Sequence, residues 1–176
     1  MKKSIELNDY LSQINSALTS GILLTTKAGD RVNTMTIGWA QIGVIWGRPI
    51  ASVFVRESRF SFRQLLENPE FTLNIPRGAL NRQILGRAGT QSGRDIDKIK
   101  ELGLTLEESS VISVPGIKEF PLTLECSVLY SHRIDPKQLP VDIQTKSYPV
   151  GVSGSGANES AHWVYCGEIK AAYLID

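Results

Sequence analysis

The sequence contains few of the residues that carry covalent, acid–base or metal chemistry in proteins. Of its 176 residues, only two are histidine and two are cysteine. His132 and His162 lack a metal-ligand spacing with each other or with the cysteines, and we interpret both as ordinary strand histidines. Cys126 and Cys166 lie in separate apolar runs, where a free cysteine behaves as a small core residue. We therefore expect no metal site and no protein nucleophile, and we favour core packing over a redox pair.

Sequence signatures of several common enzyme classes are also missing. No G-x-G-x-x-G opens a helix after a predicted strand, so a Rossmann dinucleotide site is unsupported. There is no G-x-x-x-x-G-K-[ST] phosphate loop and no G-x-S-x-G nucleophile elbow. The chemistry of this chain is therefore expected to come from a bound cofactor rather than from a catalytic side chain.

Long apolar runs and a strong net charge are absent as well. No run approaches the ~20 apolar residues that a transmembrane helix needs. The segment MKKSIELNDYL has two lysines but no apolar core of a secretory signal. The net charge of +1 creates no overall field that attracts nucleic acid or anionic lipid. We expect a cytoplasmic protein with no nucleic-acid and no membrane partner.

Helices are predicted in three places. Residues 8–19 place apolar side chains at three- and four-residue intervals, which predicts an amphipathic helix. Residues 59–69 predict a second helix, with Ser58 as its N-cap. Residues 79–102 predict one or two short helices around a polar turn at 89–94.

The remaining pattern is typical of a mainly β chain with peripheral helices. A Gly-Asp turn within 28–31 joins the first two strands as a hairpin, and 151–160 is Gly- and Ser-rich and predicts a loop. Because strands and helices do not alternate, we expect one domain spanning residues 1–176, built as a mainly antiparallel closed barrel. The predicted strands cover residues 22–27, 33–42, 50–55, 71–76, 122–135 and 162–175.

The stretch from Asn33 to Arg63 suits the binding of a planar, phosphorylated ligand. Small hydroxyl residues and Gly38 let a ligand approach the backbone closely, and arginine pairs with phosphate bidentately. Ser58, the free amides of the next turn and the positive end of the helix dipole together form an anion site. The stretch also carries two tryptophans, Trp39 and Trp46, and four arginines, Arg48, Arg56, Arg59 and Arg63.

Each part of this region also has an ordinary structural interpretation. The arginines of the helix start can be solvated, or can pair with Glu57 and Glu67. Residues 33–39 can be a plain edge strand, and residues 92–98 can be a charged turn that caps a helix. The residues taken one segment at a time leave these alternatives open.

Five segments follow one another in an informative order. They are NTMTIGW at 33–39, IWGRP at 45–49, VFVRESRF at 53–60, SGRDIDK at 92–98 with GLT at 103–105, and HWVYCGEI at 162–169. In this order they resemble the flavin reductase-like family, whose fold is the FMN-binding split barrel, and within it the flavoredoxin branch. The resemblance covers nearly the whole chain from about Gly21. It implies an antiparallel split β-barrel that binds FMN.

The resemblance further implies which residues contact the cofactor. The strand of Asn33 passes beside the isoalloxazine, where backbone amides and hydroxyls tune the flavin. Arg56, Ser58 and Arg59 match the phosphate-binding part, with help from Ser61, and Lys98 matches a further cationic contact. The implied cofactor-binding residues are Asn33, Met35, Thr36, Ile37, Arg56, Ser58, Arg59, Ser61 and Lys98.

The sequence departs from the family pattern at two positions. Glu57 stands where a proline is common, and so places a negative charge beside the expected phosphate. Cys166 stands at a small or aliphatic position. Packing is the simplest account of Cys166, although a cysteine near a flavin also responds to oxidants. We expect Asp97 to orient Arg94 or Lys98 rather than to act in catalysis.

The resemblance implies an FMN-dependent oxidoreductase. In the leading hypothesis NADH or NADPH reduces bound FMN, which passes electrons to a free flavin, ferric iron, a quinone-like acceptor or a protein. The alternative is a flavoredoxin-like electron carrier without NAD(P)H turnover of its own. A third hypothesis is a cofactor-binding or sensing domain, although the scarcity of histidine disfavours haem. The family usually forms homodimers with FMN near the subunit interface, and Trp39 and Trp46 fit such an interface; Trp46 could instead cover one flavin face.

Overall fold

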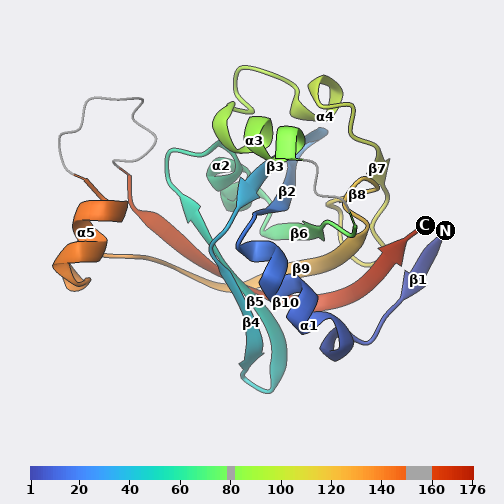
Figure 1. The fold of residues 1–176 in the computed structure, drawn as a ribbon, viewed down its shortest axis with the longest axis horizontal. Coiled ribbons are helices and arrows are strands. Elements are labelled where there is room, and N and C mark those ends of the chain that lie inside the picture. The colour runs from blue at the N-terminus through green and yellow to red at the C-terminus, as the bar shows by residue number, and fades with distance from the viewer. Residues whose placement is uncertain (79–81, 150–159) are drawn as a thin grey trace.

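An antiparallel β-sheet forms the body of the protein (Figure 1). The computed structural model describes residues 1–78, 82–149 and 160–176. In these ranges eight strands join in the order β3-β2-β6-β9-β10-β5-β4, with β1 beside β10. The strands are β1 (Lys2–Ser4), β2 (Ile22–Ala28), β3 (Arg31–Ile37), β4 (Ala40–Ile45), β5 (Arg48–Arg56), β6 (Glu70–Ile75), β9 (Leu122–Arg133) and β10 (His162–Ile175); β7 (Leu106–Glu107) and β8 (Gly116–Ile117) form a small separate pair.

The barrel is split between two strands that are consecutive in the chain. β3 and β4 are the two edges of the sheet order, so the barrel is split, as the resemblance implies, and not closed, as the strand pattern alone predicted. The single strand predicted over 33–42 is also divided, because Gly38 and Trp39 separate β3 from β4. A Cβ on Gly38 would lie 3.3 Å from the carbonyl oxygen of Leu18, so the chain turns here against the first helix. This break places Trp39 at the open side of the barrel.

The sheet curls around one main apolar core. β5 is buried on both sides, as its continuous apolar run predicts, with Val53 and Val55 fully inaccessible. β10 lies between β5 and β9, and its first residue, His162, is the register partner of Arg56. The two strands predicted at 122–135 and 162–175 are confirmed as the longest in the described part. Their pairing brings the C-terminal segment beside the Arg56 corner.

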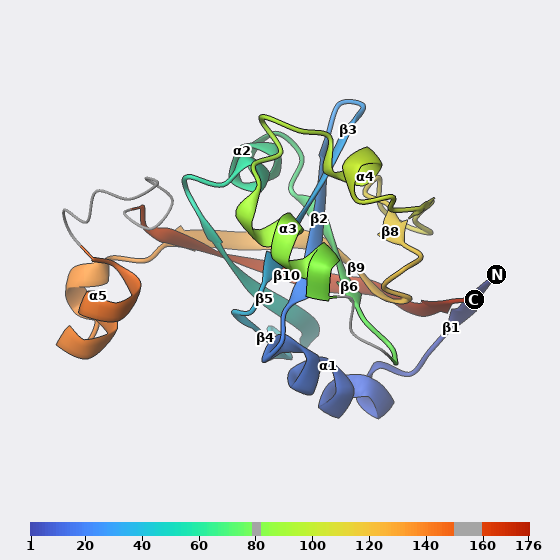
Figure 2. The same ribbon diagram turned by 45° about the horizontal axis from the view of Figure 1, so that its top comes forward.

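Helices pack against several parts of this body (Figure 2). The helix predicted at 8–19 is confirmed as the 3₁₀ turn η1 (Leu7–Tyr10) and α1 (Leu11–Leu18). The short helices predicted within 79–102 are α3 (Arg82–Thr90) and α4 (Lys98–Glu101). They lie with α2 (Phe60–Glu67) over the β2–β3 hairpin (Figures 1 and 2). None of the helices in the described ranges is long and apolar enough to cross a membrane.

The predicted N-cap of α2 is wrong. Arg59, not Ser58, has the extended N-cap conformation, and no side-chain hydrogen bond caps the helix. The Ser58 hydroxyl is instead bonded to Ser160, a residue 102 positions away, which no local sequence rule could indicate.

Some short elements were not predicted. They are β1, the β7–β8 pair, the 3₁₀ turn η2 (Pro136–Gln138) and α5 (Val141–Ser147), which stands at the far end of β9 and β10 (Figure 1). They are too short to produce a clear apolar period. Of the loop predicted at 151–160, residues 151–159 lie outside the described residues.

Candidate functional site

Two cavities meet at the open side of the barrel, where α2 begins and β3 ends. The polar cavity has a volume of about 390 Å³ and the aromatic cavity a volume of about 190 Å³. Met35 and Arg59 line both cavities, so the two cavities are neighbours. The polar cavity is lined by Asn33, Met35, Ser58, Arg59, Phe60, Ser61, Thr90, Gln91, Ser92, Gly93, Arg94 and Lys98. The aromatic cavity is lined by Met35, Thr36, Ile37, Gly38, Trp39, Phe54, Arg56, Arg59 and His162.

One wall of the polar cavity is a close contact between β3 and the loop after α3. Asn33 is buried and donates from Nδ2 to Ser61 Oγ at 2.9 Å, which ties β3 to the first turn of α2. Gly93 packs against the other side of Asn33, and Arg31 donates to the Gly93 carbonyl. A Cβ on Gly93 would lie 2.7 Å from Asn33 Cγ and 2.9 Å from Phe60 Cδ1. Only glycine therefore allows the wall to close.

Three cationic side chains surround the polar cavity. Arg59 donates to the Gly89 carbonyl at 3.0 Å, and Arg94 donates to the Ser58 carbonyl at 2.7 Å. Lys98 is 4% exposed, and its Nζ donates to the carbonyls of Thr34 and Ala88. The charges converge although none of the residues that line this cavity is acidic. Such a cavity favours an anion.

Burial lowers the pKa of two of these cationic groups. Desolvation lowers the pKa of Arg59, and desolvation with a smaller contribution from Arg59 lowers the pKa of Lys98 to about 8. A bound anion would reverse both effects, because it favours the charged forms. The neighbouring cations are thus stabilised when a negative ligand is present.

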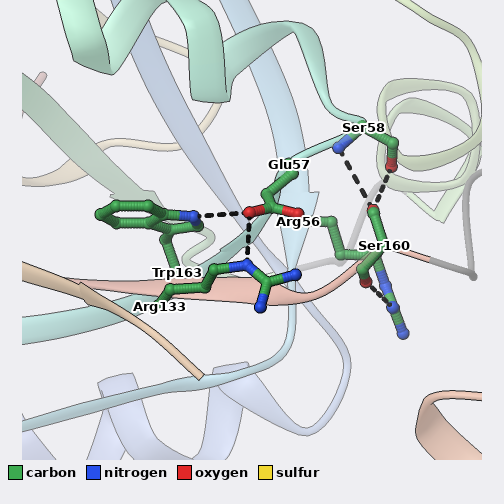
Figure 3. Close-up of polar contacts among 6 residues, drawn as sticks. All are labelled: Arg56, Glu57, Ser58, Arg133, Ser160 and Trp163. Atoms are coloured by element: carbon green, nitrogen blue, oxygen red, sulfur yellow. Dashed lines mark hydrogen bonds and ion pairs between the residues drawn. The ribbon is translucent and has the colours of Figure 1, made fainter. Parts of the chain in front are cut away.

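Glu57 does not place its charge in the site. Its Oε1 accepts from Arg133 Nε at 2.7 Å and from Trp163 Nε1 at 2.9 Å (Figure 3). The hydrogen bond from Arg133, with a further one from Trp163, lowers the pKa of Glu57. Neither cavity includes Glu57 in its lining. Glu57 is therefore not expected to repel an anion bound in the polar cavity.

The end of β10 is joined to the start of α2. Ser160 Oγ donates to Ser58 Oγ at 2.9 Å and accepts from the Ser58 amide at 3.2 Å (Figure 3). The Ser160 carbonyl accepts from Arg56 at 2.7 Å, and the Ser147 carbonyl accepts from the same guanidinium at 2.6 Å. Arg56 thus joins the end of α5 to the body of the protein, and it lines the aromatic rather than the polar cavity.

Aromatic rings form the walls of the second cavity. The Trp39 ring lies over His162 with centroids 4.7 Å apart, and Phe54 meets Trp39 edge-on at 6.5 Å. The Tyr148 hydroxyl lies 2.9 Å from His162 Nδ1. The floor is the end of β3, where Met35 and Ile37 are buried. This arrangement suits a flat ring with polar edges.

The structure brings together all nine residues that the sequence implied for the site. Each lines the polar cavity, the aromatic cavity or both. Arg56 is separated from Ser58, because it faces the aromatic cavity. Asp97 caps α4 by accepting from the Lys100 amide, so it does not orient Arg94 or Lys98 as expected. Cys166 packs with Ile50 and Val164 and lines neither cavity.

Several lining residues were missed by sequence reasoning. Arg94 and Gly93 lie in the SGRDIDK segment, and His162 opens the HWVYCGEI segment, so the motifs contained them without indicating their roles. Trp39 was expected at a subunit interface. Thr90 and Gln91 had no signal, because only the packing of α3 brings them to the cavity.

Comparison with known proteins identifies the family. The sequence matches the flavin reductase like domain over residues 16–176, so the chain belongs to this family and has its split-barrel fold. An uncharacterised protein of Archaeoglobus fulgidus is 33% identical over 71% of the chain. That match spans 66% of the relative, slightly less than two thirds of its length.

Solved structures share the same fold. Flavoredoxin of Desulfovibrio vulgaris (Miyazaki F) superposes with a TM-score of 0.65 at 24% identity, over 89% of this chain and 69% of that protein. An FMN-binding protein from Thermus thermophilus, solved with p-hydroxybenzaldehyde, superposes with a TM-score of 0.62 at 18% identity, over 88% of this chain and 70% of that protein. A second structure of the Thermus protein contains 1-cyclohex-2-enone.

The residues present in this chain fit FMN. The cations of the polar cavity suit a phosphate, and the aromatic walls and β3 backbone of the second cavity suit contact with a flat ring. Gln91 Oε1 is buried beside the cations without a hydrogen-bond partner among the described residues. A buried acceptor without a donor costs ~1–3 kcal/mol, which a hydroxyl of a sugar-like chain would recover. The site thus offers a partner to each chemical part of the cofactor.

Proposed function

We propose that this chain binds FMN across the two cavities. The observation that carries the proposal is that Met35 and Arg59 line both cavities, which places a cationic cavity beside an aromatic one. The phosphate would lie at the start of α2, with Ser58, Arg59, Ser61, Arg94 and Lys98 around it. Serine hydroxyls, guanidinium groups and helix-terminal amides are the ordinary phosphate ligands of proteins.

The ring system would lie over the end of β3. Met35, Thr36 and Ile37 supply backbone groups and an apolar floor, and Asn33 fixes this strand against α2. Arg56 contributes positive charge at the ring end of the site. The protein's share of flavin chemistry is to position the ring and tune its electronics through such groups.

We propose further that the chain is an oxidoreductase of the flavin reductase type. Bound FMN supplies the acceptance of a hydride from NADH or NADPH and the transfer of electrons onward. The aldehyde and enone in the Thermus protein support a small carbonyl compound as one class of ligand. Free flavin, ferric iron and a protein are the other acceptors proposed.

A flavoredoxin-like electron carrier is the alternative. The superposition with Desulfovibrio vulgaris flavoredoxin supports the electron carrier, and the family match supports the reductase. The test is to load the purified protein with FMN and add NADH or NADPH without oxygen. Rapid bleaching of the yellow colour supports a reductase. A protein that stays yellow until a protein donor is added supports the carrier.

We also propose a cytoplasmic homodimer in which one domain spans the chain. An exposed aromatic group supports the interface: Trp46 is 60% exposed, Tyr130 is 52% exposed, and their rings meet edge-on. Trp39, at the other end of β4, is 43% exposed beside the aromatic cavity. Light scattering should give twice 19.4 kDa, and Tyr130→Glu should give a single chain mass. Leu66→Glu, at an exposed position on α2, is the matched control.

A further inference from the structure

His162 is held in one orientation at the mouth of the aromatic cavity. The Trp39 ring lies over it at 4.7 Å, and the Tyr148 ring meets it edge-on with centroids 5.5 Å apart. His162 is 7% exposed, although it is the first residue of β10. A ring packed on two sides and fixed at one nitrogen has little freedom to rotate.

The direction of the Tyr148–His162 hydrogen bond follows from the groups involved. The Tyr148 hydroxyl is buried, and the bond to His162 Nδ1 is the one hydrogen bond that the structure records for it in the described ranges. If Nδ1 carried the proton, the hydroxyl hydrogen would have no acceptor. Because a buried donor without a partner is costly, Tyr148 donates and Nδ1 accepts.

The other ring nitrogen of His162 must then carry the proton. Nε2 has no hydrogen bond in the described part of the protein, yet it is not among the buried polar atoms without a partner. His162 lines the aromatic cavity, and Nε2 is the ring nitrogen that Tyr148 leaves available to a ligand there. Desolvation, with Arg56 and then Arg59, lowers the pKa of His162 to about 4, so the ring is neutral near pH 7.

Arg56 supports this arrangement from the side. Its guanidinium lies 5.3 Å from the Tyr148 ring and donates to the neighbouring Ser147 carbonyl at 2.6 Å. It therefore anchors the residue that fixes His162. Arg56, Arg59 and Tyr148 are the charged or titratable groups recorded as acting on His162.

We propose that Tyr148 is a positioning residue that holds His162 as the Nε2–H tautomer, so that the imidazole offers an N–H donor to a carbonyl oxygen in the aromatic cavity. The carbonyl belongs to a planar ligand stacked at the ring end of the site. The choice of ligand rests on the proposed FMN function, whereas the tautomer does not. The site therefore selects acceptor oxygens and presents no imidazolium acid.

The tautomer is tested without any cofactor. The chain has two histidines, so His132→Gln at an exposed position leaves His162 as the only imidazole. In this background the ¹⁵N and ¹H spectra of labelled histidine should show a protonated Nε2 and an unprotonated Nδ1 at pH 7. A protonated Nδ1 overturns the proposal. This measurement is made on a protein that keeps Tyr148.

The role of Tyr148 is tested in the same background. Tyr148→Phe removes the hydroxyl but keeps the ring, and it should shift the ratio of the two tautomers about fivefold towards Nδ1–H. It should also raise the pKa of His162, because the hydroxyl stabilises the neutral form. Tyr130→Phe, which alters the tyrosine stacked on residue 132, is the matched control. An unchanged tautomer ratio in a folded Tyr148→Phe protein overturns the positioning role.

The ligand is tested with 1-cyclohex-2-enone on the FMN-loaded protein. The enone should shift the Nε2–H proton of His162, and Tyr148→Phe should weaken enone binding only by the fraction of Nε2–H tautomer that is lost, without changing FMN affinity. Cyclohex-2-enol, which lacks the carbonyl, should produce a smaller shift. If FMN fails to bind, the proposed function fails while the tautomer result stands. If FMN binds and the enone leaves the Nε2–H signal unchanged, the carbonyl assignment fails.

Discussion

Gly93 lies so close to Asn33 that a Cβ on the glycine would be 2.7 Å from Asn33 Cγ. This contact closes the wall between β3 and the loop after α3, and Asn33 in turn holds Ser61 at 2.9 Å. Two segments that are about sixty residues apart in the sequence therefore share one packed surface. The geometry of the polar cavity depends on that surface.

Gly93→Ala should damage the site. The added methyl group must displace Asn33 or Phe60, and overpacking of this kind costs ~1–3 kcal/mol. FMN affinity, measured by quenching of flavin fluorescence, should fall at least ~tenfold, since displacement of Asn33 also releases Ser61. Gly43→Ala is the control, because a Cβ there meets nothing within 4 Å. Equal FMN affinities of the two variants would show that the contact between Gly93 and Asn33 does not support FMN binding.

Arg59→Gln should weaken FMN more than riboflavin. Arg59 is half-buried beside the start of α2, and a hydrogen bond to a charged group contributes ~1.5–3 kcal/mol. We expect FMN affinity to fall at least ~tenfold, while riboflavin, which has no phosphate, changes by less than ~threefold. Calorimetric titration measures both. Arg63→Gln, one turn further along α2 and outside both cavities, should leave both affinities unchanged.

FMN affinity should fall as the pH rises from 7 to 9. Lys98 has a pKa of about 8 in the free protein, and a nearby phosphate dianion would raise that pKa. The ammonium is present in both states at pH 7. At pH 9 the free protein has lost the proton and must take it up on binding. The expected loss of affinity is up to ~tenfold over this range.

Two comparisons assign this pH dependence to Lys98. Riboflavin binding should be flat over the same range, because riboflavin carries no phosphate. Lys98→Met should bind FMN more weakly at pH 7 and lose the dependence on pH. A wild-type affinity for FMN that is constant from pH 7 to 9 would exclude Lys98 from the phosphate contacts.

Glu57→Gln should leave FMN binding intact. The carboxylate is paired with Arg133 and Trp163 and lines neither cavity, so it exerts little repulsion on the site. We expect FMN affinity within ~twofold of wild type, and a loss of stability below ~1 kcal/mol because Arg133 is exposed. Chemical denaturation and fluorescence titration measure the two quantities. A gain of tenfold in FMN affinity would show that Glu57 does act on the phosphate.

The sequence predicted the strands of the barrel well because their apolar runs are long. Residues 50–55 and 71–76 are strands with boundaries close to those expected. Gly38 alone did not reveal the break between β3 and β4, since the break depends on contact with Leu18 in α1. Ser58 looked like a cap because local rules favour serine there, but Ser160 binds its hydroxyl.

The site was predicted unevenly for the same reason. Contiguous residues such as Asn33, Arg59 and Ser61 could be placed from one segment and its resemblance. Gln91 and Tyr148 could not, because each reaches the site through tertiary packing. His162 lies in a motif, but the sequence gives no spacing to a partner. Its environment depends on the pairing of β10 with β5, which sets His162 beside Arg56.

A titration of the purified chain with FMN and with riboflavin decides whether the site binds the phosphate. We expect saturable binding of one FMN per chain, with riboflavin weaker by at least ~tenfold, because the cations around Ser58 and Arg59 contribute only when a phosphate is present. The absence of saturable FMN binding, or equal affinities for FMN and riboflavin, would contradict this expectation.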